Sequence, residues 1–183
     1  MAGDEVELPI FELPVVLLPG ELMPLHIFEE RYKRMIARCL EDGEPFGIVF
    51  RDEELGARRV GCEARVTEVT ERFDDGRLNI IVTGERPFRV LDRFEAAEFP
   101  AGEVEPVDPP PEDAELETYD SYGIAARVEL PAETKQRLLE LRSEPERMRI
   151  LAAALGALVD AVSRSREIAE RAKVNGRVII GDL

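Results

Sequence analysis

The chain has 183 residues, 44% of them hydrophobic, and its 24 basic and 39 acidic side chains give a net charge of −15. This length suits one domain, or one compact domain with a helical appendage. The acidic composition argues against a nucleic-acid partner or an acidic membrane, because both attract basic surfaces, and it suits a basic or apolar polypeptide partner.

The N-terminal residues give no sign of targeting to a membrane. Residues 1–9 read MAGDEVELP, which is too acidic for a signal peptide. No apolar run in the sequence approaches the ~20 residues that a membrane span needs. We therefore expect a soluble, cytoplasmic protein with no membrane partner.

Residues 9–36 predict a strand, a turn and a helix entry. Two apolar runs, Pro9–Leu13 and Val15–Leu18, are separated by one proline. Pro19-Gly20 predicts a type II turn, because proline presets φ at the first central position and glycine accepts a positive φ at the second. Pro24–Phe28 then forms an extended stretch before the helix. The segment holds no group arranged for chemistry, which favours a binding role.

A helix is expected over Glu29–Asp42, ended by Gly43 at the C′ position. Its apolar residues follow one stripe of a 3.6-residue period: Tyr32, Met35, Ile36, Cys39 and Leu40. Cys39 lies on this stripe, and Cys62 lies on the inward face of a later strand. We expect two buried free thiols rather than a disulfide.

Short strands with tight turns fill residues 46–107. The expected elements are a buried strand Phe46–Phe50, a charged loop Arg51–Arg58, an alternating strand from Arg59 with a bulge near Thr67-Glu68, a hairpin turn Asp74–Gly76, a strand Leu78–Val82, a turn Gly84–Pro87, a strand Phe88–Phe94 and a last strand Glu98–Val107. With one early helix, this pattern indicates an α+β fold built on a small, partly closed β-barrel over residues 6–107.

A proline-rich linker at residues 108–114 separates the barrel from a helical subdomain at residues 115–174. One helix is expected over Ala132–Leu141. A second should begin after Ser143, because Ser-Glu-Pro-Glu matches a capping box with proline in the first turn.

The second of these helices carries an apolar stripe: Met148, Leu151, Leu155, Leu158 and Val162. The stripe suits either a coiled-coil seam or packing against the barrel and the neighbouring helices, and its short length favours packing. Residues 175–183 form a tail in which Val178–Ile180 predicts a short strand. Such a strand should pair with the protein's own sheet or with that of another copy.

The sequence offers little for catalysis. It contains no GxxxxGK[ST], GxGxxG, GxSxG or CxxC motif, and a single histidine cannot build the usual zinc sites. A histidine-dependent hydrolase would have to use His26, which has no nucleophile nearby in sequence. The many carboxylate pairs lie in turns, loops or helix starts, as solvated faces do. We expect no catalytic, cofactor-binding or metal-binding residue, and therefore no enzyme.

The first 95 residues resemble the N-terminal, substrate-binding domain of Lon proteases. The matching elements are Pro9-Ile10-Phe11, Leu13-Pro14, Val16–Gly20, Pro24–Glu29, Arg31-Tyr32, Phe46–Val49, Val60–Ala64, Asp75–Ile80 and Gly84–Phe88. Residues 135–140 and 146–148 resemble the C-terminal helices of the family more loosely, and the chain departs from the family between Pro109 and Leu130.

This resemblance implies a PUA-like pseudo-barrel followed by a helical subdomain. In full-length Lon an ATPase module and a Ser-Lys protease follow this region, and this chain has no P-loop. The chain is therefore expected to be a stand-alone member that neither hydrolyses ATP nor cleaves peptides. The roles that carry over are the recognition of unfolded or tagged polypeptides and self-association, so a homo-oligomer is one possible state.

The candidate peptide-binding surface follows the first turn and comprises Leu22, Met23, Leu25, His26 and Ile27. Its apolar members suit an exposed groove between barrel and helices, and methionine suits adaptable binding. The alternative is that the four apolar residues belong to the core. Two other functions stay open, namely a structural adaptor that acts through self-association and a hydrolase that uses His26.

Overall fold

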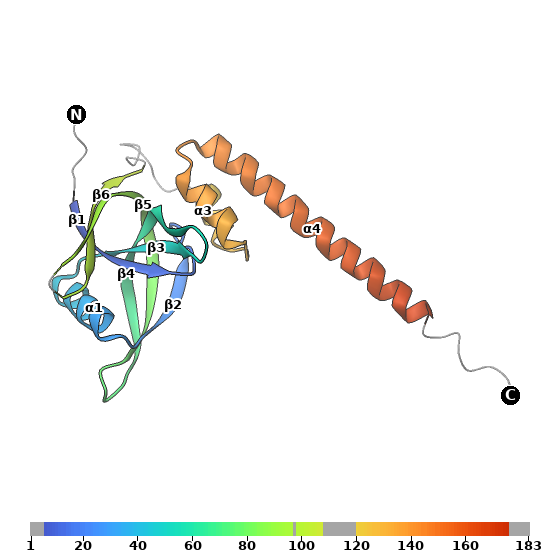
Figure 1. Ribbon diagram of the computed structural model, residues 1–183. Coiled ribbons are helices and arrows are strands. Elements are labelled where there is room, and N and C mark those ends of the chain that lie inside the picture. Colours follow the sequence, from blue (N-terminus) through green and yellow to red (C-terminus); the bar gives the residue numbers. More distant parts are fainter. Residues whose placement is uncertain (1–5, 97, 108–119, 176–183) are drawn as a thin grey trace.

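A computed structural model describes residues 6–96, 98–107 and 120–175. In this part of the chain, six strands form one sheet in the order β2-β5-β4-β3-β1-β6. Their bounds are β1 Val6–Leu13, β2 Leu22–Ile27, β3 Phe46–Asp52, β4 Gly56–Arg72, β5 Leu78–Glu95 and β6 Pro100–Pro106. Strand β6 also pairs with the second half of β5, so the sheet curls into a partly closed barrel (Figure 1). The predicted α+β barrel is confirmed.

Alternating side chains of the long strands fill the barrel. In β4 the buried side chains are Val60, Cys62 and Ala64. In β5 they include Leu78, Ile80 and Val82, which pair with the C-terminal half of β4. The bulge predicted near Thr67-Glu68 is present in β4 as a register shift between Val66 and Glu68. The predicted hairpin turn ends at Gly76, which has a φ of 82°. Both cysteines are buried free thiols, as expected.

Two loops of the sequence prediction are wrong. Gly84–Pro87 is no turn, because β5 continues through it and changes register there against Cys62 and Ala64 of β4. A register shift of this kind lets a strand bend around a barrel corner without ending. The charged loop expected at Arg51–Arg58 is much shorter, because β3 extends to Asp52 and β4 starts at Gly56. The Asp52 carboxylate closes this turn by accepting two backbone N–H groups.

Helix α1, Glu30–Asp42, covers one opening of the barrel (Figure 1). It buries Tyr32, Met35, Ile36 and Cys39 of the predicted stripe. Gly43 follows with a φ of 70°, the left-handed conformation expected of a C′ glycine.

Between residues 120 and 175 the structure describes three helices: α2 Ser121–Ala125, α3 Ala132–Glu140 and α4 Glu144–Asn175. The first turns of α4 pack on the other two, and Leu151 is only 1% exposed. The distal part of the helix projects away from the body (Figure 1), and its residues 156–172 are exposed. The prediction that the whole stripe packs is therefore wrong for its distal part, since Leu158 and Val162 are exposed.

Some predictions fall outside the described residues. They include the linker at residues 108–114, the start of the helical subdomain and the strand expected at Val178–Ile180. Across residues 6–96, 98–107 and 120–175, no helix combines the length and apolar character needed to cross a membrane.

Candidate functional site

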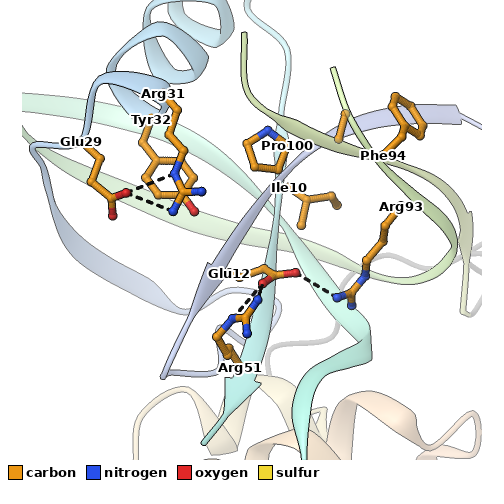
Figure 2. Close-up of a pocket in the computed structure, with 10 residues that line it drawn as sticks. Ile10, Glu12, Glu29, Arg31, Tyr32, Arg51, Arg93, Phe94 and Pro100 are labelled. Carbon is orange, nitrogen blue, oxygen red and sulfur yellow. Dashed lines mark hydrogen bonds and ion pairs between the residues drawn. The ribbon is translucent and has the colours of Figure 1, made fainter. Parts of the chain in front are cut away.

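Among the hollows of the described surface that several elements line, two differ in the character of their walls. The smaller, of about 510 Å³, lies between β1, β6 and the start of α1 and is lined by charged side chains (Figure 2). The larger, of about 890 Å³, lies between the first turn, β5 and α2. The larger one adjoins the surface expected from the sequence, so it is the candidate functional site.

Strand β2 divides the five predicted site residues between its two faces. Leu22 is 66% exposed and His26 is also exposed, whereas Met23 and Leu25 are half-buried and pack against the core. Ile27 is 1% exposed and belongs to the core. This alternation follows from the two-residue period of a strand. The structure therefore brings Leu22 and His26 to the outer face, and only Leu22 lines the larger hollow.

The turn before Leu22 is held rigidly against β5. Glu21 N donates to Leu18 O at 3.0 Å and Gly20 has a φ of 76°, as the predicted type II turn requires. Gly20 N donates to Gly84 O at 2.8 Å, and Gly84 N donates to Glu21 O at 3.0 Å. Gly84 must be glycine, because a Cβ there would lie 2.1 Å from Leu18 O.

The Glu21 carboxylate ties the same turn to the helical part. One of its oxygens accepts the Leu18 N–H at 3.0 Å, and the other pairs with the Lys135 ammonium on α3. Both charged side chains are largely buried, so solvent screens the pair weakly. Leu22 therefore projects from a turn that is fixed on the sheet side and on the helix side.

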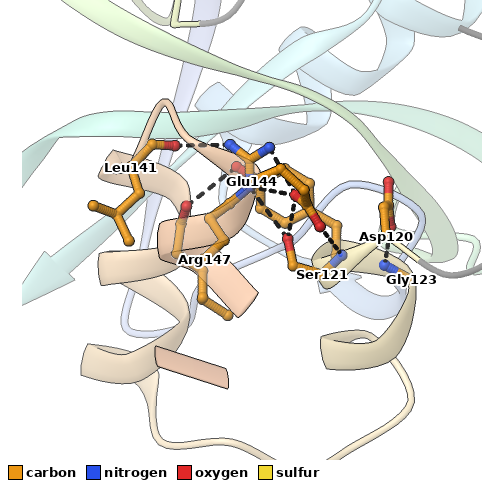
Figure 3. A network of polar contacts seen from close by, with 8 residues as sticks. Asp120, Ser121, Gly123, Leu141, Glu144 and Arg147 are labelled. Atoms are coloured by element: carbon orange, nitrogen blue, oxygen red, sulfur yellow. Dashed lines mark hydrogen bonds and ion pairs between the residues drawn. The ribbon is translucent and has the colours of Figure 1, made fainter. Parts of the chain in front are cut away.

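Helix α2 forms the opposite wall and is itself anchored to α4 (Figure 3). The Glu144 carboxylate accepts both the backbone N–H and the hydroxyl of Ser121, at 2.7 and 2.8 Å. Arg147 donates to Glu144 at 3.0 Å and to Leu141 O at 2.8 Å. Burial acts to raise the pKa of Glu144, but hydrogen bonds from Ser121 and Arg147 outweigh it and leave the pKa below the usual 4.5.

The walls of the larger hollow are mostly apolar or backbone. They comprise Pro19, Gly20, Leu22, Thr83, Gly84, Glu85, Asp120, Gly123, Ala126 and Arg127. Only Glu85, Asp120 and Arg127 among them carry charge. Sequence reasoning missed the β5 and α2 walls. One sequence signal for the β5 wall is Gly84-Glu85, which belongs to a motif that resembles the Lon N-terminal domain. The expectation of a turn at Gly84–Pro87 concealed this wall.

His26 is held by an amide and by aromatic rings. Its Nδ1 lies 2.6 Å from the Asn79 side-chain oxygen, and Asn79 donates to Glu71 at 2.9 Å. The His26 ring stacks on Phe28 at 5.9 Å and meets Phe73 edge-on at 6.0 Å. These contacts describe an exposed histidine that is hydrogen-bonded and lies beside two aromatic rings.

The two thiols are buried, and the described residues hold no cluster of metal ligands. Burial raises the pKa of Cys39 to about 11 and that of Cys62 well above its usual 9.0, so both thiols stay protonated. Within residues 6–96, 98–107 and 120–175, no three His, Cys, Asp or Glu side chains gather as metal ligands would.

Comparisons with known proteins agree with this architecture. The family described as the ATP-dependent protease La (LON) substrate-binding domain matches residues 7–122. The crystal structure of a Lon N-terminal domain protein from Xanthomonas campestris has a TM-score of 0.67 at 24% identity, over 81% of this chain and 98% of that chain. The N-terminal domain of Mycobacterium avium complex Lon protease has a TM-score of 0.61 at 19% identity, over 80% of this chain and 96% of that chain.

The two solved structures show a shared fold, and the family match covers more than half of the chain. The matched region runs from β1 through the whole barrel to the first residues of α2. It therefore includes the first turn and the β5 wall of the larger hollow. The resemblance expected from the sequence is confirmed: this chain belongs to the LON substrate-binding domain family.

Proposed function

We propose that this protein is a non-enzymatic module that binds unfolded or tagged polypeptide segments in the groove between the first turn, β5 and α2. The observation that carries the proposal is Leu22, a large apolar side chain that is 66% exposed at the edge of an 890 Å³ groove. A large exposed apolar side chain beside a concave surface is typical of a binding site.

The rigidity of the turn supports the same function. The hydrogen bonds to Gly84 and the Glu21–Lys135 ion pair hold Leu22 in place before a ligand arrives. A preformed anchor lowers the entropy that is lost on binding. An unfolded segment would then place an apolar side chain against Leu22 and its extended backbone along the groove.

Charge favours some segments over others. Residues 1–107 contain 13 basic and 24 acidic side chains, a net charge of −11. This field attracts basic polypeptides and repels nucleic acids. Family membership supports the substrate class, and the buried protonated thiols and the hydrogen-bonded His26 support a role without chemistry.

A titration of labelled, reduced and alkylated lysozyme, an unfolded basic polypeptide, followed by fluorescence anisotropy, tests the proposal. The wild-type protein should bind in the micromolar range, and Leu22→Asp should weaken binding by about 10-fold or more, as loss of a central apolar anchor does. Leu55→Asp is the matched control, because Leu55 is 70% exposed in the β3–β4 turn and lies away from the groove. Absence of binding at tens of micromolar to folded wild-type protein would contradict the proposal, as would equal losses in the two variants.

Self-association through distal α4 is a second candidate function. Val159 and Ile168 are 64% and 68% exposed on a helix segment that projects from the body (Figure 1). In proteins most of the stability of a helix comes from the packing of its apolar face, and a second copy of this helix would supply a packing partner. Light scattering should give a dimer or larger for the wild type and a monomer for Val159→Asp. A wild-type monomer at 100 µM or so would exclude this role.

A further inference from the structure

The charged hollow of Figure 2 shares no residue with the groove described above. Three arginines from three elements reach it: Arg31 from α1, Arg51 from β3 and Arg93 from β5. Two carboxylates accompany them, Glu12 from β1 and Glu29 before α1. The charged lining therefore carries a net charge of +1, whereas residues 1–107 as a whole carry −11.

The guanidinium groups are fixed before any ligand arrives. Glu12 accepts Arg51 Nε at 2.9 Å on one oxygen and Arg93 Nη1 at 2.9 Å on the other. Arg31 donates to one Glu29 oxygen through Nε and Nη2, at 3.1 and 3.0 Å, and its guanidinium lies 4.5 Å from the centre of the Tyr32 ring. Each guanidinium carries five N–H groups, and these contacts use only some of them. Oriented donors therefore remain for an incoming anion.

The floor of the hollow is apolar. Ile10, Tyr32 and Ala101 are buried beneath it, and Phe94 and Pro100 form part of its side. Figure 2 shows Ile10 and Pro100 between Arg31 on one side and Arg93 on the other. A ligand that fits must therefore offer a negative group to the arginines and an apolar group to the floor.

From this arrangement we infer that the hollow is a second binding site, which takes the free C-terminal carboxylate of a polypeptide together with its last, apolar side chain. A C-terminal residue carries one negative charge beside one side chain, which matches the single excess positive charge and the apolar floor. Glu12 and Glu29 repel a polyanion, so nucleic acid fits poorly. An internal segment carries no carboxylate of its own backbone, so the site would distinguish chain ends from chain interiors.

The test uses two forms of one flexible peptide, a fluorescein-labelled Gly-Ser chain that ends in Ala-Ala-Leu with either a free carboxylate or a carboxamide. The peptide is titrated with full-length protein and followed by anisotropy. The acid form should bind at least about 10-fold more tightly than the amide, because the fixed guanidinium groups recognise the carboxylate. Equal affinity of the two forms, or no binding of either at about 1 mM protein, would overturn the inference.

Two arginine variants locate the effect. Arg31 and Arg51 have side chains that are at least half exposed, so Arg31→Gln and Arg51→Gln should leave the fold intact by circular dichroism. Each should reduce the preference for the acid form, and the double variant should bring the acid-to-amide ratio close to one. Arg38→Gln is the matched control, since Arg38 is exposed on α1 and does not line the hollow. A ratio that the double variant leaves unchanged would overturn the inference.

One further variant separates this site from the groove. Leu22→Asp should leave binding of the acid peptide unchanged, because Leu22 lines only the groove. If binding of the unfolded lysozyme proves independent of Leu22 while the acid form of the peptide still binds more tightly than the amide, the proposed function fails and the carboxylate site stands. If the acid preference itself requires Leu22, the separate site is refuted.

Discussion

Replacement of Gly84 by alanine tests whether the first turn is built by close backbone packing. A Cβ at this position would lie 2.1 Å from Leu18 O, 2.8 Å from the Leu18 carbonyl carbon and 3.1 Å from Leu17 Cγ. Two of these atoms belong to the backbone, so no side-chain rotation relieves the clash. The turn that carries Leu22 must therefore move away from β5.

The cost follows from what this movement breaks. Two hydrogen bonds join the turn to Gly84, at 2.8 and 3.0 Å, and each contributes about 1 kcal/mol net. Overpacking in a dense interior adds about 1–3 kcal/mol. We expect Gly84→Ala to lower the free energy of unfolding by about 3–5 kcal/mol, as these two terms together require. The variant should also bind the unfolded lysozyme more weakly, because Leu22 is displaced with the turn.

Urea unfolding followed by circular dichroism measures the change. Gly156→Ala is the matched control, because a Cβ on this α4 residue meets no atom within 4 Å. In the interior of an exposed helix, alanine is favoured over glycine by about 1 kcal/mol, so the control should be neutral or stabilising. A Gly84→Ala variant within about 0.5 kcal/mol of the wild type would refute the close-packing argument.

Three other outcomes are expected. Leu151→Ala should cost about 3 kcal/mol in urea unfolding, because it empties a fully buried site where α4 docks, and a loss below about 1 kcal/mol would show that the docking is loose. Cys39 and Cys62 should react with a thiol reagent at pH 8 only after unfolding, since burial keeps both protonated, and rapid labelling of native protein would contradict this. The lowered pKa of Glu144 stabilises the fold above about pH 4.5 and ceases to do so as the pH falls through the lower, folded-state value. A pH series of melting temperatures should therefore fall less steeply on the acid side for Glu144→Gln, and parallel curves would exclude this contribution.

The elements around the first turn were predictable because local chemistry determines them. Proline and glycine specify the turn at residues 19–20, and the spacing from Tyr32 to Cys39 specifies one helix face. Gly43 then ends the helix for a conformational reason that sequence alone reveals. The burial of Cys62 likewise follows from strand alternation.

The walls of the groove were not predictable because they depend on distant pairs. Lys135 pairs with Glu21, although more than a hundred residues separate them in the sequence, and no local sequence pattern predicts that contact. Gly84 looked like a turn residue, although its role is to admit the Leu18 carbonyl while the strand continues. Composition alone did not distinguish these two uses of glycine.

The predicted peptide-binding residues of β2 show a second reason why the sequence alone was insufficient. Leu22 and Ile27 are both apolar residues of one short segment, yet one is exposed and the other is buried. The period of two separates them only once the segment is known to be a strand with a defined inner face. The exposure of distal α4 was not predicted for a related reason. An apolar stripe shows that a helix has an apolar face, but it does not show which element covers that face.

Site-directed cross-linking tests the central claim, polypeptide binding in the groove beside Leu22, most directly. A reduced, unfolded polypeptide that carries a benzophenone is bound to the protein, irradiated and digested, and the cross-linked residues are identified by mass spectrometry. We predict that the cross-links fall on residues that line the groove and that Leu22→Asp loses them. These residues are Pro19, Gly20, Leu22, Thr83, Gly84, Glu85, Asp120, Gly123, Ala126 and Arg127. Cross-links spread evenly over the surface, or equally frequent at the Leu55 turn, would contradict the account.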